Sequence, residues 1–191
     1  MNVSRESVEI TGKVAIVTTS AGVIHAYFYP DVAPNHVRNF LYLAQKGFYS
    51  NVPFHRVVEG FVIQAGKARA DWREKIAPLK AEFSKLAHQA GTIAAARTSD
   101  PNSATSQFYF VISRTHAHHL DNQYTVFGQA FRGIDVIETI ADRWVAKTKH
   151  MSEREADAAG SDDRIEKIEI VDAAPFAEEI EAFRKTLVEQ T

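Results

Sequence analysis

Residues 54–66 hold an arginine, a glutamine and aromatic side chains at short spacing. Arg56 is a permanently charged donor with a forked geometry that no other side chain offers, and Gln64 adds an amide eight residues later. Such groups can hold a substrate by hydrogen bonding without transferring a proton. Taken singly, each residue has a plainer interpretation: Arg56 as a surface ion-pair partner, Phe61 as a core residue and Gln107 as a satisfied buried amide. The interpretation therefore depends on the pattern that they form together.

Nucleophilic and metal chemistry find little support in the sequence. The 191 residues include no cysteine, which excludes disulfides, thiol nucleophiles and thiolate metal sites. His116, His118 and His119 lie close enough in sequence to bind zinc or nickel adventitiously, but no carboxylate at a matching spacing accompanies them. We expect no metal site and no cofactor.

The charge balance gives no reason to expect nucleic acid or an acidic membrane as a partner. There are 22 Lys and Arg residues against 24 Asp and Glu residues, for a formal net charge of -2. Residues 1–6 are charged and lack the apolar core of a signal peptide, and no apolar run approaches the ~18 residues of a transmembrane helix. We expect a cytoplasmic protein, or a periplasmic one if a leader has been removed.

The elements that must position these residues are mostly short strands. Pro34 suits the first turn of a helix, which continues as an apolar stripe and ends near Gly47. Two more helices are expected over residues 133–141 and 176–187, while the charged stretch 142–163 reads as a mobile loop. Strands rich in β-branched and aromatic residues are expected at residues 8–10, 13–18, 23–29, 54–58, 61–64, 92–96, 107–112, 125–128 and 165–171.

Three ordered segments resemble the signature of the cyclophilin-type peptidyl-prolyl cis-trans isomerases. Residues 54–66 read FHRVVEGFVIQAG, residues 91–110 read GTIAAARTSDPNSATSQFYF, and residues 120–128 read LDNQYTVFG. The similarity extends from about residue 13 to residue 171, and three motifs in order are far more specific than one. Residues 77–82 also resemble an insert that bacterial members carry before their Gly-Thr strand.

The resemblance implies a mainly β fold. It predicts an eight-stranded antiparallel closed barrel capped by two helices, with the active site on its outer face. Closure would also remove the exposed edges that so many strands otherwise leave. We expect residues 1–173 to form this barrel domain and residues 174–191 to add an amphipathic C-terminal helix.

The resemblance also implies an activity and the residues that carry it. Members of the family turn peptide bonds preceding proline between cis and trans, and Arg56 matches their catalytic arginine, assisted by Gln64. In the twisted bond the proline nitrogen becomes a hydrogen-bond acceptor, which suits a charged, forked donor. Nine positions match the family's substrate contacts, and residues 96 and 97 make these contacts through their backbone. The nine are Phe61, Val62, Ala96, Arg97, Gln107, Tyr109, His119, Leu120 and Tyr124.

Four positions depart from the family's pattern. Val62 stands where methionine is usual, and Tyr109 stands where phenylalanine is usual, which adds a hydroxyl that needs a partner or water. Glu59 replaces a common proline and brings a negative charge near Arg56 in sequence. His119 occupies the position of a tryptophan associated with tight cyclosporin binding, so we expect weak binding of cyclosporin.

The sequence leaves two other functions open. The main interpretation is an active isomerase whose partners are proline-containing peptides and unfolded protein chains. Val62 and Tyr109 keep open a module that binds proline peptides with little catalysis. The C-terminal helix keeps open a holding chaperone in which that helix carries a client or a partner, although packing of the helix against the barrel is the favoured interpretation.

Overall fold

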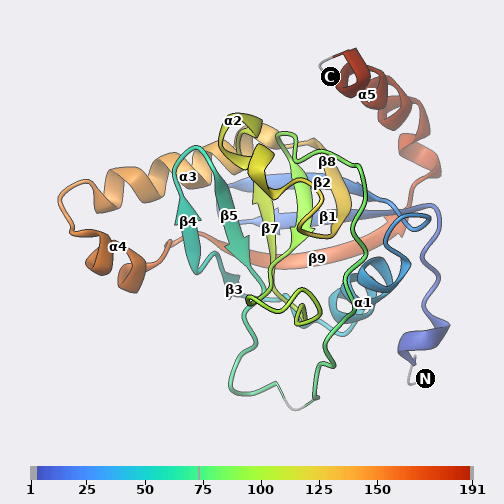
Figure 1. The fold of residues 1–191 in the computed structure, drawn as a ribbon, viewed down its shortest axis with the longest axis horizontal. Helices are drawn as coiled ribbons and strands as arrows, with labels where there is room; N and C mark the ends of the chain where they lie inside the picture. The colour runs from blue at the N-terminus through green and yellow to red at the C-terminus, as the bar shows by residue number, and fades with distance from the viewer. Residues whose placement is uncertain (1–3, 73, 190–191) are drawn as a thin grey trace.

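The centre of the molecule is one antiparallel sheet of nine strands (Figure 1). The computed structural model describes residues 4–72 and 74–189, and within them no helix combines the length and apolar character needed to cross a bilayer. The strand order is β3-β9-β1-β2-β8-β6-β7-β5-β4. The strands are β1 (Lys13–Thr19), β2 (Gly22–Phe28), β3 (Val52–Pro53), β4 (Arg56–Val58), β5 (Val62–Ala65), β6 (Thr92–Ala95), β7 (Phe108–Val111), β8 (Val126–Arg132) and β9 (Arg164–Asp172).

The sheet does not form the predicted closed eight-stranded barrel; among the described residues its two outermost strands, β3 and β4, are not paired. These strands follow each other in the chain with only Phe54 and His55 between them, but β3 pairs with β9 and β4 pairs with β5. The amide N–H of Phe54 instead donates to the carbonyl of Asp163 at 3.1 Å. The result is an antiparallel sheet curled into a half-barrel. Residues 8–10, predicted as a strand, also lie outside the strands.

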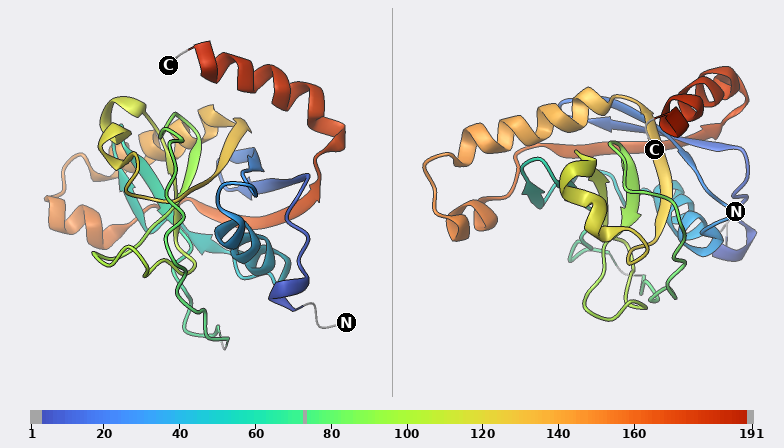
Figure 2. Two further views of the ribbon diagram at one scale, coloured as in Figure 1. Left: turned by 45° about the vertical axis from the view of Figure 1, so that its right-hand side comes forward. Right: turned by 45° about the horizontal axis from the view of Figure 1, so that its top comes forward.

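Helices cover the two ends of the curled sheet (Figures 1 and 2). Phe40 enters the core from α1, where its ring lies 5.0 Å from that of Tyr49 and 5.2 Å from that of Phe108. Ile137 and Ile140 enter from α3 and are fully buried. Pro34 begins α1 and Gly47 follows its end, as predicted. The helical segments are η1 (Arg5–Ser7), α1 (Pro34–Gln45), α2 (Arg114–Ala117), η2 (His118–Leu120), α3 (Ile134–Thr148), α4 (Glu153–Ala159), η3 (Ala174–Phe176) and α5 (Ala177–Glu189).

A carboxylate from a distant loop caps the N-terminus of α1. The loop between β5 and β6 extends below the sheet in Figure 1, and its residue Glu82 hydrogen-bonds to the first turn of the helix. The Glu82 carboxylate accepts hydrogen bonds from the amides of Asn35 and His36, both at 3.1 Å, and from the His36 ring at 2.6 Å. It satisfies helix N–H groups that Ala33, at the cap position, cannot satisfy with its side chain.

The stretch 142–163 is more ordered than its charge predicted. α3 continues through its first part, and Ser152 begins α4 with a capping box completed by Glu155. Ala156 is buried, and the ammonium group of Lys147 donates to the carbonyl of Gly160 at 3.1 Å. The prediction of a mobile loop was wrong because short capped helices need little hydrophobic periodicity when they pack against a core.

The C-terminal helix α5 packs on the outside of the sheet. Ile180 is buried in a cluster with Tyr27 and Phe131. The Arg132 guanidinium pairs with the Glu179 carboxylate, and the Arg184 guanidinium lies 4.7 Å from the centre of the Tyr27 ring. Packing therefore buries Ile180 and partly covers Phe176 and Phe183 of the apolar stripe. The division of the chain at residue 173 stays a prediction.

Candidate active site

A groove on the outer face of the sheet collects most of the predicted site residues. Its volume is about 400 Å³, and ten residues of the described chain line it. All ten belong to the predicted set; only Gln107 of that set is missing from the lining. The lining residues are Arg56, Phe61, Val62, Gln64, Ala96, Arg97, Tyr109, His119, Leu120 and Tyr124.

The register of the strands places the central residues in a row. Arg56 on β4 lies opposite Gln64 on β5, and Gln64 lies opposite Tyr109 on β7. Because side chains alternate across a strand, residues paired in this way point to the same face of the sheet. Their neighbours Val57 and Ile63 point into the core, where both are buried. The sheet itself therefore sets the spacing between the guanidinium, the amide and the aromatic ring.

The Arg56 side chain is exposed, and no hydrogen bond or ion pair engages it among the residues that the structure describes. Glu59, close in sequence, makes no ion pair with it there. The intervening turn is a hairpin closed by the Phe61 amide, which donates to the Val58 carbonyl at 3.0 Å. Gly60 adopts φ of +66° in this turn, a conformation that favours glycine. The guanidinium is thus held at the groove edge with its donors free for a ligand.

Gln64 is anchored from behind by the side chain of Gln107, which also binds His55. Its amide nitrogen donates to Gln107 Oε1 at 2.9 Å, and the His55 Nε2–H donates to the same oxygen at 3.0 Å. Burial lowers the pKa of His55, which favours the neutral ring. Gln107 thus lies behind the groove, and we expect it to act on a substrate through Gln64. With its amide nitrogen engaged, Gln64 offers its carbonyl oxygen to the groove.

The apolar part of the groove belongs to a second hydrophobic cluster outside the main core. Val62, Tyr109 and Leu120 are all buried members of this cluster, and Phe61 packs against it. The ring of His119 lies 5.4 Å from that of Phe61. The segment α2–η2 carries His119 and Leu120 over the sheet, so the recess is closed on one side by residues from a different part of the chain. The recess beside Arg56 is therefore apolar and has aromatic walls.

The opposite wall is formed by the segment after β6. The Ala96 amide donates to the Gln107 carbonyl at 3.0 Å, which fixes the backbone there. The Arg97 guanidinium lies 4.3 Å from the centre of the Tyr124 ring and donates to the Gln123 carbonyl at 2.8 Å. The side chain of Arg97 thus ties two segments of the wall together.

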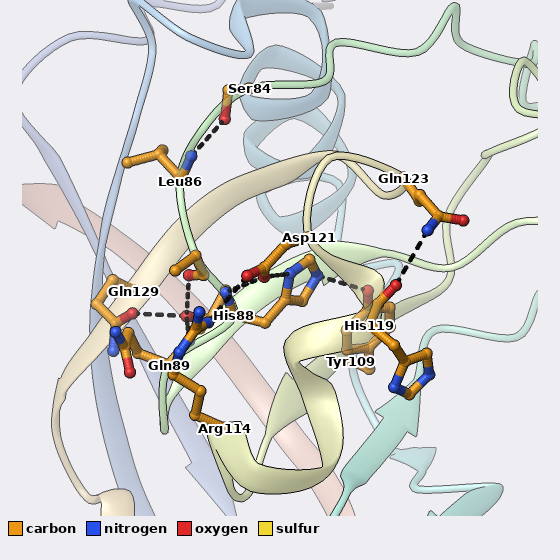
Figure 3. Close-up of polar contacts among 12 residues, drawn as sticks. Ser84, Leu86, His88, Gln89, Tyr109, Arg114, His119, Asp121, Gln123 and Gln129 are labelled. Atoms are coloured by element: carbon orange, nitrogen blue, oxygen red, sulfur yellow. Dashed lines mark hydrogen bonds and ion pairs between the residues drawn. The ribbon is translucent and has the colours of Figure 1, made fainter. Parts of the chain in front are cut away.

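His88 is a residue of this region that the sequence did not single out. It is fully buried, and its Nε2 lies 3.0 Å from the Tyr109 hydroxyl (Figure 3). It belongs to the long loop before β6, which has no periodicity to mark it. The signal that could have found it is the extra hydroxyl of Tyr109, which required a polar partner. Among the described residues no group of three or more His, Asp or Glu side chains is arranged to hold a metal ion.

The fold and the groove define a class of protein. An antiparallel half-barrel presents on its outer face a small apolar recess, a free guanidinium and an oriented amide, which suits a ligand with an apolar ring next to a peptide bond. Comparison with known proteins identifies the family. A model of the cyclophilin-type peptidyl-prolyl cis-trans isomerases matches residues 13–170. The chain belongs to this family.

Curated relatives carry the same name. A peptidyl-prolyl cis-trans isomerase of Acinetobacter baylyi is 40% identical over 130 residues, which are 65% of this chain and 69% of that protein. A probable isomerase of Brucella abortus is 35% identical over 154 residues, 74% of each chain. An isomerase of Rhizopus delemar is 35% identical over 153 residues, 76% of this chain, but these span only 24% of its own length. The predicted class of enzyme is confirmed at the level of the family.

Solved structures share the fold. A crystal structure of a cyclophilin from Hirschia baltica has a TM-score of 0.68 at 21% identity, with 88% of this chain and 81% of that chain covered. A cyclophilin-type isomerase from Cryptosporidium parvum, crystallised in the presence of the dipeptide Ala-Pro, has a TM-score of 0.69 at 24% identity, with 83% and 98% covered. The mainly β, antiparallel character of the prediction is therefore confirmed.

Proposed function

We propose that this groove accelerates the cis–trans rotation of X–Pro peptide bonds in flexible or unfolded protein chains. The proline ring occupies the recess formed by Phe61, Val62, Tyr109 and Leu120. The observation that carries the proposal is the exposed Arg56 guanidinium, free of protein partners among the described residues, at the edge of that recess. Because no protein group among the described residues engages the Arg56 guanidinium, its N–H donors are available to a bound substrate.

Catalysis of this rotation requires that the site bind the twisted X–Pro peptide bond more tightly than the planar one. Resonance between the amide nitrogen and the carbonyl creates a barrier of about 18–20 kcal/mol, so uncatalysed exchange takes tens to hundreds of seconds. The two planar ground states differ little in free energy, and only tighter binding of the twisted state raises the rate. Shortening the exchange time from ~100 s to ~1 ms requires about 7 kcal/mol of such preference.

Arg56 is the group that binds the twisted state more tightly than the planar states. In the twisted state the proline nitrogen pyramidalises, and its lone pair becomes a hydrogen-bond acceptor. The guanidinium donates to this nitrogen and finds no comparable acceptor in the planar state, where the lone pair is delocalised. Rotation itself needs no nucleophile and no proton transfer. The donor must remain charged throughout, which an arginine does at any physiological pH.

The other groups hold the two halves of the bond. The recess fixes the proline ring, so the carbonyl of the preceding residue is the part that turns. Gln64, oriented by Gln107, hydrogen-bonds the substrate backbone through its carbonyl oxygen, and backbone groups of Ala96 and Arg97 anchor the residue before proline. Orientation by such fixed groups raises the rate of isomerisation because folding has already set the productive geometry before the substrate binds.

The test is a protease-coupled isomerisation assay on a proline tetrapeptide. We expect R56A to lower kcat/KM by about 10²–10³-fold, the size seen when one preorganised donor to a developing acceptor is removed. R56K keeps the charge but loses the fork and should recover only part of the rate. R154A, which removes an exposed arginine of α4 outside the groove, is the matched control and should retain wild-type activity.

The same assay separates catalysis from simple binding. If wild type and R56A are equally slow while both still bind a prolyl peptide, the groove is a binding module and the catalytic proposal is wrong. Suppression of aggregation of an unfolded client that survives R56A would instead support a holding function, for which α5 would be the element to truncate.

A further inference from the structure

The hydroxyl of Tyr109 points out of the groove and into the protein. Its ring lines the groove, but its oxygen lies 3.0 Å from Nε2 of His88, which does not line the groove and is fully buried. Burial raises the pKa of Tyr109 well above its usual value, so the hydroxyl keeps its proton. The polar end of the ring therefore has a partner on the side away from the groove (Figure 3).

His88 is itself fixed by Asp121. The Nδ1 atom of His88 lies 2.9 Å from Asp121 Oδ1, and the His88 amide donates to the same oxygen at 2.8 Å. Arg114 donates to the other carboxylate oxygen at 3.0 Å. Although burial would raise the pKa of Asp121, hydrogen bonds from His88 and Arg114 hold it below its ordinary value. An ionised Asp121 is an acceptor only, so the proton of a neutral His88 must sit on Nδ1.

The tautomer determines the direction of the chain of hydrogen bonds. With Nδ1 protonated, Nε2 carries a lone pair and accepts the proton of the Tyr109 hydroxyl. Burial lowers the pKa of His88 despite the neighbouring carboxylate, which keeps the ring neutral. The rings of His88 and Tyr109 are also nearly parallel, at 16° with centroids 6.0 Å apart. Every polar atom between Tyr109 and the surface thus has a partner of the correct kind.

We propose that His88 is a positioning residue for Tyr109, and that Asp121 sets its tautomer. Together they hold the hydroxyl away from the groove, so the ring presents an apolar surface to the proline although it is a tyrosine. The network also links three segments, because Tyr109 comes from β7, His88 from the long loop and Asp121 from the turn after His119 and Leu120. This inference rests on the proposed function.

The alternative role of Tyr109 is direct contact of its hydroxyl with the substrate. In that case the hydroxyl proton would be offered to the peptide and His88 would be a spectator. A double-mutant cycle distinguishes the two roles. The variants are H88F, which keeps a flat ring but removes both nitrogens, Y109F, which removes only the hydroxyl, and the double variant. H150F replaces an exposed histidine after α3 and serves as the control.

We expect Y109F to lose less kcat/KM than H88F, because the hydroxyl that it removes does not face the substrate. H88F should lose about tenfold, equivalent to about 1.4 kcal/mol, because the stranded hydroxyl must turn toward water in the groove and shift the ring. The double variant should recover most of this loss. If the role of His88 were purely structural, H88F would lower Tm but leave kcat/KM of the folded fraction unchanged. Adding Y109F would then restore nothing.

The tautomer is measured separately on the wild-type protein by ¹⁵N NMR of the histidine rings. Protonated Nδ1 and unprotonated Nε2 at His88 would support the proposal. Because this measurement uses the wild-type protein, it remains possible even if H88F fails to fold. The inference is overturned if His88 carries its proton on Nε2, if Y109F alone loses tenfold, or if the double variant is no better than H88F. An inactive wild type would sink the proposed function instead, which the R56A comparison reveals independently.

Discussion

Removal of the Glu82 carboxylate should destabilise the protein more than any exposed carboxylate does. The side chain is 13% exposed, and its two oxygens accept four hydrogen bonds, two from amides at the start of α1 and two from the side chains of Asn35 and His36. In E82A these donors lose their acceptor, and the ring of His36, 3% exposed, has little water to replace it. Since α1 fills one end of the sheet, fraying of its first turn is transmitted to the core.

The magnitude follows from these contacts. Loss of a helix cap costs about 0.5–2 kcal/mol, and a hydrogen bond to a charged group contributes about 1.5–3 kcal/mol. These values overlap and are not additive, so we expect about 2–4 kcal/mol for E82A. For a chain of this size each kcal/mol lowers Tm by about 2–4 °C, which predicts a fall of about 5–15 °C.

The assay is urea and thermal unfolding at two pH values. Although burial would raise the pKa of Glu82, its hydrogen bonds hold that pKa below the ordinary value of 4.5. The stabilisation is therefore complete above pH ~4.5 and is lost as the pH falls through the folded-state pKa. The difference between wild type and E82A should shrink between pH 7 and pH 3. E138A, on the exposed face of α3, is the control and should change stability by less than about 0.5 kcal/mol. Equal stability of E82A and wild type at pH 7 would refute the reasoning.

Three other predictions follow from particular contacts. Because burial lowers the pKa of His88 from 6.5, the unfolded chain binds more protons below that pH, so wild type should lose stability between pH 7 and pH 5 and H88F should lose less in the same titration. I180A should cost about 2 kcal/mol in urea unfolding while kcat/KM stays unchanged, since Ile180 packs α5 on the sheet away from the groove. Wild type should bind cyclosporin weakly by calorimetry, and H119W should tighten binding; a nanomolar dissociation constant for wild type would contradict this.

The groove was predictable where local pattern and motif agree. The hairpin of β4 and β5 follows from alternating side chains around Glu59 and Gly60, and this alternation alone places Arg56 and Gln64 on one face. The closure of the sheet was not predictable in this way. Strand pattern shows which residues face the core, but it does not show which strands meet at the edges. Here β3 pairs with β9 and β4 pairs with β5, and among the described residues β3 and β4 do not pair with each other.

His88 and Glu82 escaped prediction for a different reason. Both belong to the long loop before β6, where no hydrophobic period marks the residues that point inward. Each is defined by a partner far away in sequence, Tyr109 for one and the start of α1 for the other. Single polar contacts of this kind leave no trace in local sequence, although the unmatched hydroxyl of Tyr109 showed that a partner was needed.

The structure of β7 predicts that activity and stability are coupled at some groove positions and separate at others. Phe108 and Phe110 point into the main core, while Tyr109 and Val111 belong to the second cluster that forms the groove. A strand that is apolar on both faces must be covered on both, and here α2 and η2 cover the outer one. Truncation of Leu120 should therefore lower stability and activity together, because the recess is itself a small core. Arg56 makes no such contacts among the described residues, so R56A should lower kcat/KM by the ~10²–10³-fold proposed above and leave Tm nearly unchanged.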